Sequence, residues 1–228
     1  MLFSSSPIRR RTFSCMRGDL TIRGTEYRPN GEKLPIAIVC HGFMANQQTV
    51  RQYTRLLAKI GYCAYCFDFC GYAQSRPYTG NTLLLMGCSQ GGMVSALTAA
   101  KHPDAVDRLV LFYPAFCIPD DARAGHMMMA HFDPQNLPEK IHCGPMPLGR
   151  CYPEAVMHMD VFREITPYTG RVLIVHGTAD GIVKPDYAKK AAEAYANAEL
   201  HLIDGGAHGF NRRHDAEAIR YLTAFAAL

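Results

Sequence analysis

The stretch LLLMGCSQGGM, residues 83–93, decides the fold of this chain. An apolar run typical of a buried strand ends at Gly-Cys-Ser-Gln-Gly-Gly, and a second apolar stretch follows it. Glycine tolerates the strained backbone of a tight strand-to-helix turn, and the spacing Gly87-x-Ser89-x-Gly91 places a serine at its centre. Three interpretations follow: Ser89 is a nucleophile, Cys88 is the nucleophile, or the segment is only a glycine-rich turn.

Short apolar runs alternate with helical patterns along the rest of the chain. The runs that we expect to form strands span residues 36–40, 62–69, 83–86, 109–113, 172–176 and 199–203. The expected helices span about residues 46–60, 91–101, 186–197 and 214–226. Residues 11–28 precede them and resemble an antiparallel hairpin. This alternation predicts an α/β protein with a mostly parallel sheet and helices on both faces.

The length of 228 residues suits one domain, residues 1–228. Residues 116–165 interrupt the alternation, because they are rich in Met, His and Pro and show no clear period. Loops this long in an α/β fold usually cover a site, so we expect a lid or cap inserted in the domain.

Charge and cysteine content argue against several classes of protein. The net charge of +4 comes from the first 28 residues. We interpret Arg9-Arg10-Arg11 as a solvated N-terminal tail rather than a contact with a nucleic acid or a membrane, so no such partner is expected. No apolar run approaches the ~20 residues of a membrane span, and the N-terminus does not resemble a signal peptide. Nine cysteines indicate free thiols in a reducing, cytoplasmic setting. Cys63 and Cys66 would face opposite sides of a strand, so no metal site is predicted.

Four of the predicted strands are followed by residues that carry chemistry. These are His41-Gly42-Phe43, the serine turn, Gly177-Thr178-Ala179-Asp180, and Asp204-Gly205-Gly206-Ala207-His208. Because parallel strands deliver their carboxyl ends to one edge of a sheet, these turns should lie close together. The order Ser89, Asp180, His208 is that of one known catalytic triad arrangement.

Each type of residue has a role in such a site. A histidine takes the proton of the serine hydroxyl, and a carboxylate holds the histidine in the correct tautomer. The backbone N–H groups of Gln90 and Phe43 should stabilise an oxyanion. Among the rivals, Asp204 remains an alternative acid. The others are Asp160 and His214, and His214 is better suited to begin the final helix. Cys88 is expected to pack beneath the turn.

The motifs HGF, GCSQGG, HGTAD and GGAHGF resemble the α/β-hydrolase superfamily, and within it the small serine esterases of the cinnamoyl or feruloyl esterase type, over about residues 20–228. The resemblance implies the triad Ser89, Asp180 and His208, with Phe43 and Gln90 as oxyanion donors. It also implies that the lid supplies an acid and a tyrosine to the phenolic end of the substrate. By position these are Asp121 and Tyr152, although Asp120 is as close and packing within the lid is an equal alternative.

One segment departs from the family pattern. Only residues 70–81 join the strand ending in FDF to the strand before the serine, which is too short for the usual crossover helix with its loops. A missing or shortened helix would leave an apolar face uncovered, and such faces lead to a homodimer or to aggregation.

These observations predict an enzyme that hydrolyses small esters through an acyl-enzyme, without a cofactor or a metal. Hydroxycinnamate esters are the first expectation for the substrate. A thioesterase, an acyltransferase or a peptidase of the same fold would use the same residues, and a catalytically silent binding module is the alternative from another class. No phosphate-binding glycine motif supports a nucleotide-binding protein.

Overall fold

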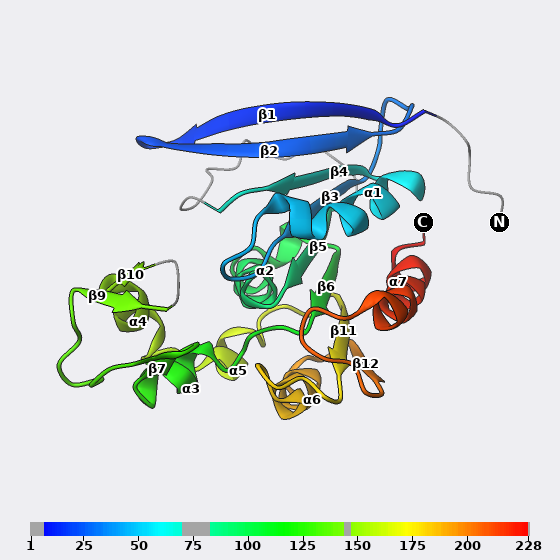
Figure 1. Cartoon of the computed structure of the whole chain (residues 1–228). Helices are drawn as coiled ribbons and strands as arrows, with labels where there is room; N and C mark the ends of the chain where they lie inside the picture. Colours follow the sequence, from blue (N-terminus) through cyan, green and yellow to red (C-terminus); the bar gives the residue numbers. More distant parts are fainter. Residues whose placement is uncertain (1–6, 70–82, 144–146, 228) are drawn as a thin grey trace.

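An eight-stranded sheet forms the centre of the computed structural model, which describes residues 7–69, 83–143 and 147–227 (Figure 1). The strand order is β1-β2-β4-β3-β5-β6-β11-β12. Their bounds are β1 Arg9–Arg17, β2 Leu20–Arg28, β3 Ile36–Cys40, β4 Cys63–Phe67, β5 Leu83–Cys88, β6 Arg108–Phe112, β11 Arg171–Gly177 and β12 Ala198–Ile203. Strands β1, β2 and β4 pair antiparallel, and every other neighbouring pair is parallel. The prediction of a mostly parallel sheet preceded by a hairpin is confirmed.

Helices cover both faces of this sheet, as predicted. Their bounds are α1 Arg51–Lys59, α2 Gln90–Lys101, α6 Pro185–Ala194 and α7 Arg212–Ala226, with short 3-10 helices η1 at Gln47–Val50 and η2 at Pro103–Ala105. The predicted helix 46–60 therefore begins as a 3-10 turn, in which the Asn46 side chain accepts a hydrogen bond from the Gln48 N–H. Helices α1 and α7 contribute to one apolar cluster, and α2 and α6 contribute to the other.

The central strands are apolar along their whole length because each faces a core on both sides. In β6 the side chains of Leu109 and Leu111 belong to the cluster under α2 and α6, whereas Val110 and Phe112 belong to the cluster under α1 and α7. All four side chains are fully buried. Alternation of side chains across the strand thus explains why this sequence lacks an alternating apolar and polar pattern.

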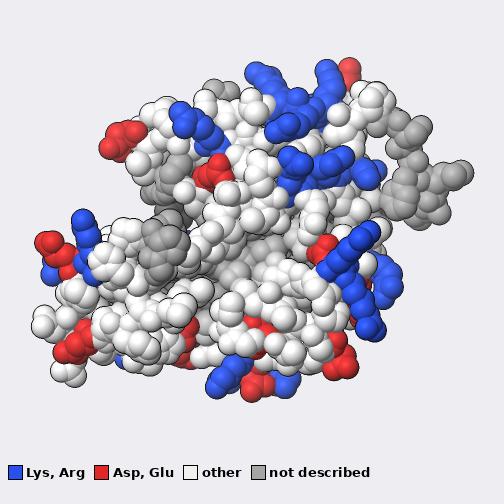
Figure 2. All heavy atoms as spheres, viewed as in Figure 1, with Lys and Arg blue, Asp and Glu red and all other residues white. Residues whose placement is uncertain are grey.

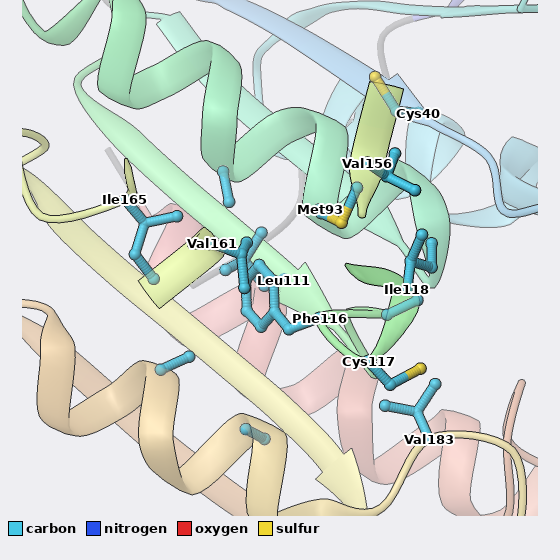
Figure 3. Packing of buried hydrophobic residues seen from close by; sticks show 14 of the residues in the cluster. Cys40, Met93, Leu111, Phe116, Cys117, Ile118, Val156, Val161, Ile165 and Val183 are labelled. Atoms are coloured by element: carbon cyan, nitrogen blue, oxygen red, sulfur yellow. The ribbon is translucent and has the colours of Figure 1, made fainter. Parts of the chain in front are cut away.

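The inserted segment, residues 116–165, folds into short elements beyond the carboxyl ends of the strands (Figure 1). They are α3 Ile118–Arg123, β7 His126–Met127, β8 Ala130–His131, β9 Lys140–His142, β10 Pro147–Gly149, α4 Cys151–Val156 and α5 Val161–Glu164. In Figure 3, Phe116 and Val161 lie next to Leu111 of β6, and Cys117 lies beside Val183. Apolar contacts therefore join the inserted segment to the central domain.

Two other expectations concern the surface and the crossover. The expectation that Arg9, Arg10 and Arg11 form a tail is wrong, because they pair with β2 as the first residues of β1. Their side chains are exposed, and basic side chains gather over this part of the molecule (Figure 2). Residues 70–81, which form the short connection predicted to lack the crossover helix, lie outside the described residues. None of the helices in the described part of the chain has the length and apolar character needed to cross a membrane.

Candidate active site

Ser89 lies in the sharp turn between β5 and α2. Its backbone has φ of 55° and ψ of −123°, a left-handed conformation that a serine rarely adopts. A Cβ atom added to Gly87 would lie 2.0 Å from the Gly91 carbonyl oxygen, and one added to Gly91 would lie 2.3 Å from the His41 carbonyl oxygen. The glycines are therefore required because the strand, the helix and the turn after β3 approach one another too closely for side chains.

His208 joins Ser89 to Asp180. Its Nε2 lies 2.9 Å from Ser89 Oγ, and its Nδ1 lies 2.7 Å from Asp180 Oδ2. A carboxylate oxygen can only accept, so Nδ1 carries the proton and the bare Nε2 accepts the hydrogen bond of the serine hydroxyl. Three residues that lie far apart in the sequence thus form one continuous hydrogen-bonded line.

The turns after β11 and β12 are held together by a close backbone contact. A Cβ atom on Gly177 would lie 2.0 Å from the Gly206 carbonyl oxygen, and the Ala179 N–H donates to that same oxygen at 2.9 Å. The Gly205 N–H donates to the hydroxyl of Thr178 at 2.8 Å. These contacts fix the distance between the turn that carries the acid and the turn that carries the histidine.

Asp180 is fully buried, and its carboxylate has a partner on both oxygens. Oδ1 accepts hydrogen bonds from the N–H groups of Ile182 and Val183, each at 2.9 Å. Oδ2 faces His208 and also lies 3.2 Å from Nε2 of His176. Burial opposes the charged form, but these hydrogen bonds outweigh it and hold the pKa of Asp180 well below its ordinary value. The acid therefore carries its negative charge at neutral pH.

The rival triad members lie elsewhere. Asp204 is exposed and its Oδ1 accepts a hydrogen bond from the Thr178 hydroxyl at 3.2 Å. Asp160 caps the start of α5, where its side chain accepts from the Arg163 N–H. His214 lies in the first turn of α7, as expected from the sequence.

Cys88, the alternative nucleophile, is buried at the end of β5. Burial raises the pKa of its thiol to about 12, and a hydrogen bond with Tyr113 opposes the rise only in part. The side chain belongs to the apolar cluster on the side of α1 and α7. A buried, protonated thiol facing away from the turn is a poor nucleophile, in agreement with the expectation that it packs beneath Ser89.

The two expected oxyanion donors flank Ser89. Gln90 is the first residue of α2, and Phe43 lies in the turn that follows β3. Both line the same pocket as Ser89. In the described part of the chain, neither backbone N–H donates a hydrogen bond, so both remain available to a ligand.

A pocket beside Ser89 is walled largely by the inserted segment. Its lining residues are mostly apolar and are Phe43, Ser89, Gln90, Ala115, Cys117, Ile118, Asp121, Met127, Met128, Leu148, Tyr152, Ile182 and Val183. Asp121 and Tyr152, the two residues expected to bind the substrate, both belong to this lining. Asp120 does not, because its carboxylate bonds with Arg123 and with the Tyr187 hydroxyl, the latter at 2.7 Å.

Tyr152 and Asp121 are the principal polar groups contributed by the inserted segment. The Tyr152 hydroxyl accepts a hydrogen bond from Gln90 Nε2 at 2.7 Å, and its ring centre lies 6.2 Å from that of Phe43. Burial raises the pKa of Asp121, against the opposing effects of the Cys117 thiol and of His126, whose Nε2 lies 3.6 Å away. One hydroxyl and one carboxyl group therefore face an otherwise apolar pocket.

His176 touches Asp180, although the sequence analysis assigns it no role beyond the end of the predicted strand 172–176 and the first position of the HGTAD motif. The available signal was an ionisable side chain at the end of an otherwise apolar run.

The described residues contain no cluster of three or more His, Cys, Asp or Glu side chains suited to a metal ion. Cys63 and Cys66 lie in β4, as predicted, and are buried. The eight cysteines within the described ranges are all free thiols.

No family model matches this chain, and no curated protein matches it. Among solved structures, it resembles Est1E from Butyrivibrio proteoclasticus, with a TM-score of 0.84 and 25% identity over 94% of this chain and 98% of that one. Est1E with ferulic acid bound aligns at a TM-score of 0.78 and 24% identity over 100% of both chains. An esterase domain from a Rhodothermus marinus protein aligns at a TM-score of 0.72 and 20% identity, over 96% and 98% of the two chains. The chain therefore has the α/β-hydrolase fold, and its resemblance to these structures supports a hydrolase.

Proposed function

We propose that this chain is a serine carboxylic-ester hydrolase that works through an acyl-enzyme. The observation that carries the proposal is the line of hydrogen bonds in which His208 joins the Ser89 hydroxyl, at 2.9 Å, to the buried Asp180 carboxylate, at 2.7 Å. A serine with this partner, in a strained turn at the mouth of a pocket, is the arrangement that acyl transfer requires.

In the proposed mechanism, His208 Nε2 takes the proton from Ser89 Oγ as this oxygen attacks the ester carbonyl carbon. The negative oxygen of the tetrahedral intermediate accepts hydrogen bonds from the N–H groups of Phe43 and Gln90. Collapse of the intermediate breaks the bond to the alcohol oxygen, which takes the proton from His208. Water then attacks the acyl group by the same route and releases the carboxylic acid. Asp180 stays ionised throughout and stabilises the imidazolium form of His208.

We propose hydroxycinnamate esters, of the feruloyl type, as the substrate class. The pocket is apolar along most of its wall, which suits an aromatic acyl group. Asp121 and Tyr152 supply polar groups for a phenolic hydroxyl. The structural likeness to Est1E, which has been solved with ferulic acid bound, supports the same class.

The first test compares the hydrolysis of methyl ferulate and p-nitrophenyl acetate by the wild type, Ser89→Ala and Cys88→Ala. Loss of a triad serine typically lowers kcat by several orders of magnitude. We expect Ser89→Ala to be inactive and Cys88→Ala to keep most of the activity, because Cys88 only packs beneath the turn. A preference for methyl ferulate in kcat/KM supports the substrate class.

Two outcomes would contradict the proposal in different ways. If a folded wild type cleaves neither ester and does not react with a fluorophosphonate probe, the chain is not a serine hydrolase. If it cleaves p-nitrophenyl acetate but not methyl ferulate, the triad stands and the feruloyl assignment is wrong.

A further inference from the structure

His176, at the carboxyl end of β11, lies against the candidate catalytic acid although no step of the mechanism uses it. Its side chain is fully buried, as is that of Asp180, four residues later. Its Nε2 lies 2.9 Å from the Val183 carbonyl oxygen and 3.2 Å from Asp180 Oδ2. One ring nitrogen thus faces both the acid itself and the far end of the turn that carries it.

The hydrogen bonds define the protonation state of this imidazole. A carbonyl oxygen can only accept, so Nε2 of His176 must carry a proton. The other nitrogen, Nδ1, is buried and has no partner within the described part of the chain. A proton on Nδ1 would be a buried donor without an acceptor, which is costly. His176 is therefore a neutral imidazole with its proton directed at Val183 and Asp180.

We propose that His176 is a positioning residue: its Nε2–H clamps the turn of residues 177–183 so that Asp180 Oδ2 faces His208. This inference rests on the proposed role of Asp180 and extends it to a second histidine. The clamp joins the two ends of the turn, because His176 lies at the end of strand β11 and its Nε2 reaches the Val183 carbonyl oxygen.

The clamp acts on a different part of the carboxylate from the other hydrogen bonds. The N–H groups of Ile182 and Val183 both bind Oδ1, so neither of them contacts the oxygen that faces His208. His176 and His208 both approach Oδ2. His176 is therefore the second histidine on the oxygen that faces His208, and through Val183 it also holds the segment whose N–H groups bind Oδ1.

Neutrality matters as much as geometry. A cation in the place of His176 would compensate the charge of Asp180 and weaken its stabilisation of the imidazolium of His208. A neutral donor supplies a hydrogen bond and leaves the negative charge of the carboxylate intact. Histidine in its neutral form meets both requirements in an apolar strand end.

The test uses two variants and a matched control. His176→Gln keeps an N–H near the position of Nε2, whereas His176→Leu fills similar space without a donor. The control is His214→Leu, which removes an imidazole that also has one buried nitrogen without a partner in the described chain but no hydrogen bond to the triad. We expect His176→Leu to lower kcat for p-nitrophenyl acetate about 10–100-fold with KM within about twofold, because small misplacements of catalytic groups act on the chemical step. His176→Gln should recover most of this loss.

A double-mutant comparison separates positioning from a general loss of structure. If His176 acts through Asp180, then His176→Leu should cause no further loss of kcat in an Asp180→Asn background. An equal fold-loss in both backgrounds would overturn the proposal. If His176→Leu does not fold, His176→Gln and His176→Asn give the same comparison, because the shorter Asn side chain does not reach Val183. Equal activity of these two variants would overturn the clamp.

A measurement without substrate separates this inference from the proposed function. Downfield proton NMR detects the Nδ1 proton of a histidine hydrogen-bonded to a carboxylate. We expect this signal of His208 to weaken or vanish in His176→Leu and to persist in His176→Gln and His214→Leu. An unchanged signal in His176→Leu would contradict the clamp, even if the wild type is an active esterase. If the signal is lost in His176→Leu as expected but the wild type cleaves no ester, only the proposed function is contradicted.

Discussion

Two acids of this protein, the buried Asp180 and the half-buried Asp121, occupy opposite kinds of environment. Asp180 sits in a short turn of the central domain and has hydrogen-bond donors on both oxygens, so its pKa is lowered despite burial. Asp121 sits in the inserted segment, where burial dominates and its pKa is raised. Protein donors on both oxygens stabilise the charge of Asp180. The Cys117 thiol and His126 compensate the charge of Asp121 only in part, so this carboxyl is better suited to share a hydrogen bond with a ligand.

The difference suggests that the two regions have different roles, one in holding the reacting groups and the other in binding the substrate. The turns at the ends of β5, β11 and β12 fix the reacting groups through backbone contacts that tolerate no side chain. The inserted segment forms most of the pocket wall from short elements and mobile side-chain types such as methionine. We expect changes in the first region to act on kcat or on folding, and changes in the second to act on KM.

The largest expected effect comes from replacing each of the two acids separately with asparagine. Asp180→Asn should lower kcat by about 10³–10⁴-fold, because the amide favours the wrong tautomer of His208. Asp121→Asn should leave kcat within a few-fold and raise KM for methyl ferulate. Steady-state kinetics with both variants measure the contrast, and Asp204→Asn, which changes an exposed acid, is the control. Equal effects on kcat from the Asp180 and Asp121 variants would remove the distinction.

The next effect concerns folding and uses two glycines of the same turn. Gly177→Ala places a methyl group 2.0 Å from the Gly206 carbonyl oxygen, so the backbone must shift. We expect a loss of about 3 kcal/mol or more in the free energy of unfolding, in the range of severe core strain. At Gly181 an added Cβ has nothing within 4 Å, so Gly181→Ala should change stability little. Urea unfolding of the two variants tests the prediction, and similar losses would argue against the tight contact.

A smaller effect is expected for the hydrogen bond between the pocket wall and the turn of Ser89. Tyr152→Phe removes the hydroxyl that bonds to Gln90 Nε2. A neutral hydrogen bond contributes about 1 kcal/mol, so we expect up to about a fivefold change, mainly in KM for methyl ferulate. Tyr187→Phe removes a hydroxyl of the same kind that bonds to Asp120 outside this pocket, and should leave KM unchanged. A loss confined to kcat would place the Tyr152 hydroxyl in the chemical step instead.

The smallest expected effect is the response of stability to pH, and its sign differs between the two acids. The lowered pKa of Asp180 means that its contribution is complete above the ordinary value of 3.8 and is lost as the pH falls below it. The raised pKa of Asp121 means that its partly buried charge destabilises the protein at neutral pH and that acidification relieves this cost. Between pH 6 and pH 3, the free energy of unfolding of the wild type should therefore fall relative to that of Asp180→Asn. Over the same range it should rise relative to that of Asp121→Asn. The same sign for both variants would contradict the contrast.

The sequence alone predicted the regions that depend on local pattern. Continuous apolar runs mark strands buried on both faces, and the run 36–40 coincides with β3 at Ile36–Cys40. Because the apolar runs show where each strand ends, the residues that follow the strands could also be predicted from the sequence. Ser89, Asp180 and His208 were identified in this way. The order of the strands in the sheet was not predicted, because it depends on contacts between segments far apart in the chain.

The inserted segment shows where such reasoning ends. Its strands are only two or three residues long, so no periodicity can reveal them. Asp120 and Asp121 could not be told apart from sequence, because the direction of α3 decides which of them faces the pocket. His176 was missed for a related reason: its partners, Asp180 and Val183, meet it only when the turn closes.

The hairpin at the start of the chain has a consequence for self-association. Strand β1 ends the order of the described sheet, so its outer edge offers unpaired backbone groups to another strand. Arg9, Arg10 and Arg11 are exposed along this edge. A second copy that added its own β1 there in parallel alignment would bring its arginines against them. Clustered charge of this kind disfavours the addition of another strand to the open edge of a nine-residue strand.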